Sequence, residues 1–194
     1  MQKFTIGVRA ALSLLTLLTL GQAANAQQFD SGRAEPPEFV GKEWLNTPEN
    51  KPITLESRKG KVTIVEFWTF GCINCQRNLP AYARWQKSFQ KKGVEIIGIH
   101  TPETEEEKDI ENVKKFLKKQ KITYPILFDG KSENWKAWQQ QWWPTVWLVD
   151  KKGIVRYRWQ GELAWKGADG ERTMARKIQE LLDERVEPER KAIK

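Results

Sequence analysis

The alternation of hydrophobic and polar positions along the chain predicts five β-strands. Each segment is short, rich in Val, Ile and aromatic residues, and bounded by polar or turn-forming residues, which is typical of strands in a sheet. The predicted strands cover residues 61–68, 94–99, 126–128, 145–149 and 154–159. The last two are joined by Asp150-Lys151-Lys152-Gly153, a sequence that favours a hairpin turn.

Four other segments have the spacing of amphipathic helices. They cover residues 73–92, 104–120, 132–141 and 171–186. In the second segment, acidic residues gather at the start and lysines at the end, as the helix dipole favours. Ser132 is expected to cap the third helix. Pro80 is expected to kink the first, because proline lacks a backbone donor and its ring clashes with the preceding turn.

The order of these elements indicates the fold class. Alternating strands and helices predict parallel strands with helices on both faces, and the terminal hairpin adds antiparallel strands. The fold class is therefore α/β, with a mixed central β-sheet. The 194 residues suffice for one domain, which we expect over residues 38–187. A polar linker is expected at 27–37, where Pro36 and Pro37 occur, and a polar tail at 188–194.

Residues 1–26 have the pattern of a secretory signal peptide. Lys3 and Arg9 supply positive charge, residues 10–20 form an apolar stretch, and Ala24-Asn25-Ala26 fits a cleavage site. The apolar stretch is shorter than the ~20 residues that a membrane-spanning helix needs. This favours cleavage over a permanent anchor. We therefore expect a periplasmic protein with no stable membrane anchor after cleavage.

Composition and charge narrow the classes of partner. Charged residues make up 30% of the chain and hydrophobic residues 39%, which is typical of a soluble domain. The net charge of +8 falls to +6 without Lys3 and Arg9, and Lys and Glu alternate through much of the remaining sequence. A surface of mixed sign on an exported protein argues against nucleic acid as a partner.

The two cysteines of the chain are Cys72 and Cys75. A single pair excludes a scaffold held by several disulfides. The pair follows a predicted strand and enters a predicted helix, where the helix dipole and backbone N–H groups would stabilise a Cys72 thiolate. Cys75, one turn later, could then attack a mixed disulfide. A static disulfide would close too small a loop to stabilise the fold much, and zinc would need more ligands than His100 adds.

A carboxylate in the central predicted strand supports redox chemistry. Glu66 and Trp68 fall on the same face of the strand at 61–68. Burying a carboxylate destabilises a fold, so an acid in a central strand suggests a functional role. Burial also raises the pKa of the acid, and Glu66 could then accept the proton of Cys75 during resolution. The alternative is an acid near the strand end whose carboxylate reaches solvent.

Trp143-Pro144-Thr145 leads into a predicted strand. We expect a cis peptide bond between Trp143 and Pro144, in a tight turn beside the cysteines. Such a turn would expose the Trp143 backbone to an extended substrate segment. We therefore place Trp143, Thr145 and Trp68 in the substrate-binding surface, with Trp142 as a possible wall of an apolar groove. The alternative is an ordinary trans proline at a strand edge.

These motifs together resemble the thioredoxin superfamily, and within it the TlpA-like branch. The similarity covers residues 37–182 and is closest to the thioredoxin-like domain of DipZ-type thiol–disulfide oxidoreductases. It rests on residues 44–46, 65–80, 98–103 and 142–145.

The resemblance implies a thioredoxin-like fold and disulfide exchange with protein substrates, without a bound cofactor or metal. By position, it implies that Cys72 attacks, Cys75 resolves, Glu66 is the buried acid and Pro144 is the cis-proline. The acid in thioredoxins is usually Asp, so Glu66 departs from the pattern by one methylene. DipZ-type proteins also carry a membrane electron-transfer domain, so we expect a separate membrane electron donor here.

Two other functions remain open from the sequence. Thr69 lies three residues before Cys72, as in the Thr-x-x-Cys pattern of peroxiredoxins, but Val65 stands where that pattern has proline. Copper delivery would use His100, although the known pattern has three residues between its cysteines instead of two. A lone histidine at a strand end is more often structural.

Overall fold

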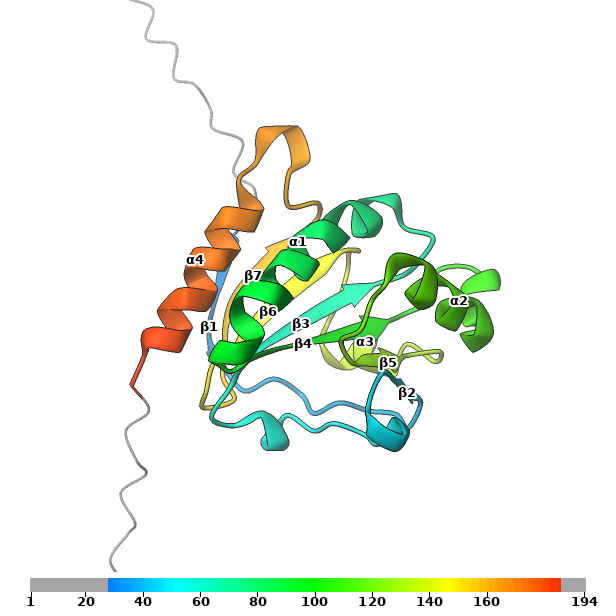
Figure 1. Cartoon of the computed structure of the whole chain (residues 1–194), viewed down its shortest axis with the longest axis horizontal. Coiled ribbons are helices and arrows are strands. Elements are labelled where there is room, and N and C mark those ends of the chain that lie inside the picture. Colours follow the sequence, from blue (N-terminus) through cyan, green and yellow to red (C-terminus); the bar gives the residue numbers. More distant parts are fainter. Residues whose placement is uncertain (1–27, 186–194) are drawn as a thin grey trace, which may run out of the picture.

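The computed structural model describes residues 28–185, and its centre is a seven-stranded sheet in the order β1-β7-β6-β3-β4-β5-β2 (Figure 1). The strands are β1 (Gln28–Ala34), β2 (Trp44–Leu45), β3 (Val62–Trp68), β4 (Val94–His100), β5 (Ile126–Phe128), β6 (Thr145–Val149) and β7 (Val155–Gln160). β3, β4 and β5 run parallel, and the other neighbouring pairs are antiparallel. The predicted mixed sheet is confirmed. The predicted signal peptide and polar tail lie outside the described residues.

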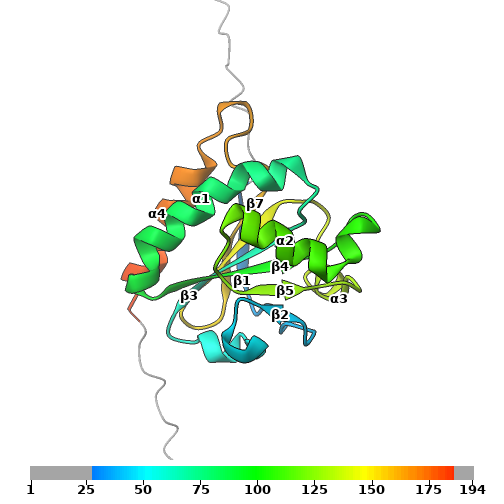
Figure 2. The same ribbon diagram turned by 45° about the vertical axis from the view of Figure 1, so that its right-hand side comes forward.

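The helices are α1 (Ile73–Phe89), α2 (Ile110–Gln120), α3 (Glu133–Ala137) and α4 (Gly170–Asp183). From β3 through β4 to β5 the strand order advances in one direction, so two right-handed crossovers place α1 and α2 on the same face. The chain then returns to β6 on the other side of β3, which places α3 on the opposite face. Figures 1 and 2 show α1 and α4 crossing one face of the sheet, with α2 beside them. Helices on both faces were predicted, and this is confirmed.

Each face of the sheet carries its own hydrophobic core. On the α1 face, Trp68 and Leu148 pack with Tyr82 of α1, Leu117 of α2 and Ile178 of α4. The opposite core is built by aromatic and aliphatic side chains of the sheet, α3 and the segment 39–55. β3 is buried on both faces along its whole length, so its neighbouring residues serve different cores.

The largest departure from the predicted elements is β1. Residues 28–34 were placed in a linker, but they pair antiparallel with β7. Without β1, β7 would present a row of unpaired backbone N–H and C=O groups at the sheet edge, and a polar segment can satisfy these groups as well as an apolar one. The two-residue strand β2 was also not predicted, because it is too short to show a periodic pattern.

Helix boundaries differ where local backbone geometry intervenes. Ser132 occupies the N-cap position of α3, as predicted, but it has a left-handed backbone (φ 55°) and its side chain makes no capping hydrogen bond. α3 ends at Ala137, four residues earlier than predicted. The segment predicted as a helix from 104 begins with a separate 3-10 turn, Glu106–Lys108, and α2 is instead capped by the Asp109 carboxylate. Pro80 lies inside α1, which continues through it.

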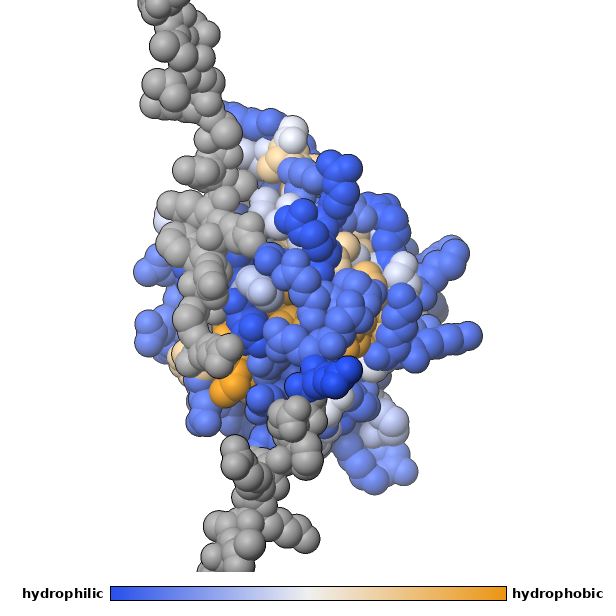
Figure 3. All heavy atoms as spheres, turned by 90° about the vertical axis from the view of Figure 1, so that its left-hand side faces the viewer, coloured by the Kyte–Doolittle hydropathy of each residue, from blue (hydrophilic) through white to orange (hydrophobic). Residues whose placement is uncertain are grey.

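The described residues contain no helix that is long and apolar enough to cross a membrane. The face of the molecule in Figure 3 is mainly hydrophilic, with small separate hydrophobic patches among charged side chains.

Candidate active site

Cys72 and Cys75 stand at the amino end of α1, immediately after the central strand. Cys72 is the N-cap residue, and its Sγ accepts a hydrogen bond from the Cys75 backbone N–H at 3.3 Å. Both cysteines are free thiols; Cys72 is partly exposed, whereas Cys75 is only 1% exposed. The N-terminal N–H groups of a helix have no partner within the helix, which is why a sulfur at this position can accept from them.

This placement gives the two thiols opposite acidities. Hydrogen bonding from the Cys75 thiol and from the backbone N–H groups of Cys75 and Asn74 lowers the pKa of Cys72 to about 7, against the opposing effects of burial and of the Glu103 charge. Burial, and then the neighbouring Cys72, raise the pKa of Cys75 far above its usual range. Near neutral pH Cys72 is therefore a ready nucleophile, and Cys75 holds its proton.

Glu66 is fully buried on the α1 face of β3. Its Oε1 accepts a hydrogen bond from the Tyr124 hydroxyl at 2.9 Å, and Oε2 has no hydrogen-bond partner among the described residues. Burial raises the pKa of Glu66 to about 8, although the Tyr124 hydrogen bond opposes this shift. The alternative of a solvent-exposed acid is thereby excluded.

Gly98, the neighbour of Glu66 in β4, makes room for this acid. A Cβ at Gly98 would lie 2.9 Å from Glu66 Oε1 and 3.0 Å from Trp68 Nε1. Glu66 and Trp68 thus share one face of β3, as the alternation predicted. No local pattern indicates that this glycine supports the acid, because the contact crosses between two strands.

Pro144 precedes β6, and the Trp143–Pro144 peptide bond is cis, as predicted. Thr145 pairs with Phe67, so this turn lies at the same end of the sheet as the cysteine motif. The Pro144 carbonyl accepts a hydrogen bond from Gly161 N–H at 2.7 Å. Trp143 is partly buried, and its ring stacks on Trp135 with 3.9 Å between centroids.

Two of the residues predicted to bind substrate are enclosed. Trp68 packs in the core against Phe116, and the Thr145 hydroxyl donates to the Trp142 carbonyl at 2.8 Å. Both side chains are buried, because β3 and β6 are covered on both faces, so their contact with substrate stays a prediction that the exposed surface of neither side chain supports. The exposed apolar side chains at this end of the sheet are instead Ile73, 57% exposed, and Trp142, 61% exposed.

His100 is buried between the aromatic rings of Phe70 and Phe128. Burial lowers its pKa to about 4, so the imidazole is neutral near pH 7. Its Nε2 lies 3.3 Å from the Thr69 hydroxyl, which therefore contacts the histidine. Residues 28–185 contain no group of three or more potential metal-ligating side chains.

The turn before Cys72 also contacts a residue that the sequence did not single out. Glu107, in the 3-10 turn before α2, is buried and accepts a hydrogen bond from Gly71 N–H at 2.7 Å. It lies in a run of acidic residues that is typical of the solvent-exposed first turn of a helix. Nearby on α1, Arg77 is exposed and pairs with Glu162 at 3.1 Å.

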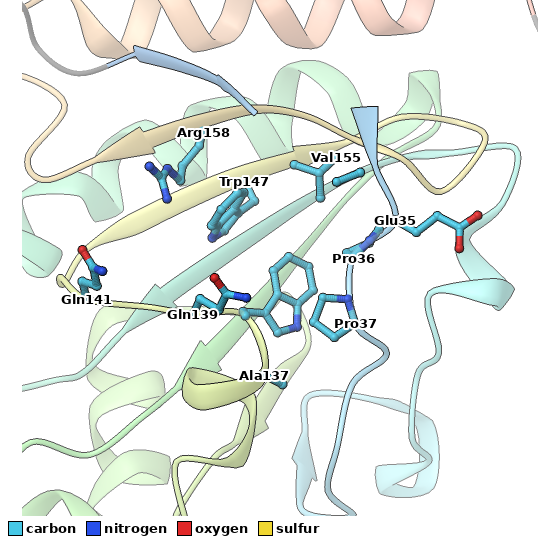
Figure 4. Close-up of a pocket in the computed structure, with 11 residues that line it drawn as sticks. Glu35, Pro36, Pro37, Ala137, Gln139, Gln141, Trp147, Val155 and Arg158 are labelled. Atoms are coloured by element: carbon cyan, nitrogen blue, oxygen red, sulfur yellow. The ribbon is translucent and has the colours of Figure 1, made fainter. Parts of the chain in front are cut away.

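A hollow of about 370 Å³ lies on the other side of the sheet (Figure 4). Trp138, Trp147 and Val155 line it, and they belong to the core opposite that of Cys75. This hollow is therefore not the place where a substrate meets the thiols.

Comparison with known proteins places these features in a family. The sequence profile described as "AhpC/TSA family" matches residues 34–158. The chain is 43% identical to protein DipZ of Mycobacterium tuberculosis (strain CDC 1551 / Oshkosh) over 119 residues, which is 61% of this chain and 17% of DipZ. It thus spans about a sixth of the length of DipZ. It is 30% identical to the thiol-disulfide oxidoreductase ResA of Geobacillus thermodenitrificans over 154 residues, 77% of this chain and 83% of ResA.

Solved structures agree on the fold. A putative thiol:disulfide interchange protein DsbE from Chlorobium tepidum superposes with a TM-score of 0.66 at 20% identity, covering 77% of this chain and 96% of that chain. StoA from Bacillus subtilis superposes with a TM-score of 0.56 at 26% identity, covering 73% and 96%. The predicted thioredoxin-like fold is confirmed.

Proposed function

The chain belongs to the AhpC/TSA family, and we propose on this basis that it is an exported thiol–disulfide oxidoreductase that exchanges disulfides with protein substrates through Cys72 and Cys75. The observation that carries the proposal is the asymmetry of the two thiols, one half-exposed with a lowered pKa and the other buried with a raised pKa. Its relatives named as thiol-disulfide oxidoreductases support the same activity.

In the first step, the Cys72 thiolate attacks one sulfur of a substrate disulfide. A bond forms between Cys72 Sγ and that sulfur, the substrate S–S bond breaks, and the other substrate sulfur leaves as a thiolate. Because the Cys72 pKa is about 7, roughly half of the protein carries the nucleophile at pH 7. The cis-proline turn before β6 lies at this end of the sheet and offers the Trp143 backbone to an extended substrate.

In the second step, Cys75 loses its proton and attacks Cys72 Sγ. The Cys72–Cys75 disulfide forms, the mixed disulfide breaks, and the substrate leaves with both sulfurs reduced. The two electrons have passed from the cysteine pair to the substrate, and the same steps in reverse oxidise a substrate dithiol. Oε2 of Glu66 is the carboxylate oxygen without a partner among the described residues, and we assign the Cys75 proton to it in molecules whose Glu66 is ionised.

Turnover of a protein disulfide such as insulin tests this function. Cys72→Ser should abolish reduction, whereas Cys75→Ser should accumulate a mixed disulfide that non-reducing electrophoresis detects. Equal trapping by both variants would contradict the assigned roles. Fast reduction of hydrogen peroxide in a stopped-flow experiment, lost in Cys72→Ser while insulin is not reduced, would favour a peroxidase.

Export to the periplasm and a separate membrane electron donor are part of the same proposal. They rest on the pattern of residues 1–26 and on the resemblance to DipZ-type proteins. Expression of the full chain in a bacterial host, followed by cell fractionation and N-terminal sequencing, tests export. The expected product begins near Gln27 in the periplasmic fraction, and an unprocessed product in the cytoplasm would contradict export.

A further inference from the structure

Two buried acceptors hold the turn that immediately precedes Cys72. The turn closes on itself, because Cys72 N–H donates to the Thr69 carbonyl at 3.3 Å. From one side, His100 Nε2 lies 3.3 Å from the Thr69 hydroxyl and 3.4 Å from Phe70 N. From the other side, Glu107 accepts from Gly71 N–H. Each of the three residues before the nucleophile is thus fixed by a side chain from another element.

Glu107 is the central member of this arrangement. Its Oε1 accepts from Gly71 N–H at 2.7 Å, and its Oε2 accepts from the backbone N–H groups of Glu103 and Thr104 at 2.6 and 2.9 Å. The carboxylate therefore joins the turn of Cys72 to the loop that follows β4. Burial alone would raise the pKa of Glu107, but hydrogen bonds from Thr69 and from these backbone groups hold it below its usual value, so the group is ionised.

The site is shaped to admit this carboxylate. A Cβ at Gly71 would lie 2.5 Å from Glu107 Oε1, so a side chain at this position would displace the oxygen. A buried, ionised carboxylate with several donors is costly to remove, because the donors are then left without partners. These contacts all end on the backbone beside Cys72 or on the loop that follows β4.

We propose that Glu107 is a positioning residue for Cys72, whose carboxylate fixes the turn 69–72 so that Cys72 Sγ stays against the N–H groups at the amino end of α1. The inference deepens the proposed function, since it concerns the thiol to which attack is assigned. In the described part of the chain Glu107 makes no hydrogen bond to either sulfur, and it acts through the backbone of Gly71.

A rival explanation is that Glu107 acts only by its negative charge. The two explanations predict opposite changes in the pKa of Cys72 when Glu107 is replaced by glutamine. A negative charge near a thiolate raises the thiol pKa, so its removal by Glu107→Gln would make Cys72 more acidic. Loss of positioning would move Sγ from its N–H donors and make Cys72 less acidic. Glu103, exposed and already opposing Cys72 ionisation by its charge, supplies a matched control for the first case.

The experiment measures the rate of Cys72 alkylation by iodoacetamide against pH in the reduced full chain, with mass spectrometry to identify the site. We expect Glu107→Gln to slow alkylation at pH 6.5 about fivefold, and Glu103→Gln to speed it slightly. Asp129→Asn serves as a stability control, because Asp129 is another buried carboxylate; it accepts from the Thr101 hydroxyl and from the N–H groups of Asn134 and Trp135, and none of these partners belongs to the turn 69–72. It should lower the melting temperature without changing the alkylation profile.

Gly71→Ala gives a second route if Glu107→Gln does not fold. It leaves the charge in place but displaces Oε1, and it should also slow alkylation. Faster alkylation in Glu107→Gln, or an unchanged profile with a lower melting temperature as in Asp129→Asn, would overturn the proposal. Insulin turnover by the wild-type chain is measured in parallel. Its absence would reject the proposed function and leave the alkylation result to decide the role of Glu107.

Discussion

Glu66 and Phe67 are neighbours in β3, yet they face chemically different halves of the molecule. Glu66 lies on the α1 face, where Tyr124 donates to its carboxylate and Cys75 is buried. Phe67 lies on the α3 face and packs against the rings of Trp135 and Trp138, with centroids 6.3 and 5.7 Å apart. One strand thus places titratable groups on one face and aromatic packing on the other, so the aromatic packing can be changed without changing the thiol chemistry.

The largest effect on the aromatic face is expected from Phe67→Ala. Removing a fully buried ring leaves a cavity and should lower the free energy of unfolding by about 3–5 kcal/mol, measured by urea denaturation. The pKa of Cys72 should not change, because the ring packs away from the thiols. A shifted Cys72 alkylation profile in the folded variant would break the separation between the two faces.

On the redox face, the stability of the reduced protein should depend on pH through Glu66. Its pKa is raised from an ordinary 4.5 to about 8, so the folded state binds the proton more tightly than the unfolded state does. This stabilising contribution is complete below about pH 4.5 and is lost as the pH rises through about 8. Between pH 5 and 8 the loss should be roughly 3 kcal/mol.

Denaturation of the reduced wild type and of Glu66→Gln at several pH values measures this contribution. The glutamine variant does not titrate at this position, so the difference between the two proteins should change with pH. A pH-independent difference would mean that Glu66 is ionised in the folded state throughout.

Glu66→Gln should also slow resolution about 100-fold, which is a typical contribution of a positioned proton acceptor. Attack by Cys72 should be unaffected, since its proton has already left. Rapid-quench trapping of the mixed disulfide separates the two steps. If attack and resolution were slowed equally, Glu66 would not be the proton acceptor for Cys75.

The smallest effect is expected from Tyr124→Phe. The Tyr124 hydrogen bond favours the ionised form of Glu66, so its loss should raise the Glu66 pKa further, by the equivalent of about 1 kcal/mol. The rate of resolution should then reach its plateau at a higher pH. Tyr82→Phe is the matched control, because the hydroxyl of Tyr82 accepts a hydrogen bond from Asn78. An equal shift in both variants would show that any lost hydroxyl in this core has the same effect.

The elements that depend on the local hydrophobic pattern were predicted correctly from the sequence. The strands at 126–128 and 145–149 have the predicted bounds, and the cysteine pair begins a helix after a strand as expected. Alternation in β3 correctly put Glu66 and Trp68 on one face. It did not reveal that Trp68 is enclosed, because burial on both sides of a strand depends on helices elsewhere in the chain.

The parts that were missed depend on contacts between distant residues. Glu107 lies in an acidic run with Glu105 and Glu106, and nothing local distinguishes the buried carboxylate from the exposed ones. β1 forms because its backbone pairs with the otherwise unpaired edge of β7. No pattern within residues 28–34 predicts that pairing. Ser132 does precede a helix, but its left-handed backbone is accompanied by the absence of the capping hydrogen bond expected of its side chain, which residue type alone does not reveal.

The close packing around Gly98 limits which residues can replace it. Even a methyl group there would meet Glu66, Trp68 and the Ile126 Cδ1 at 2.6–3.0 Å. In a library randomised at codon 98 and selected for growth that needs disulfide exchange, survivors should retain glycine, or carry a second change that shortens the acid at codon 66.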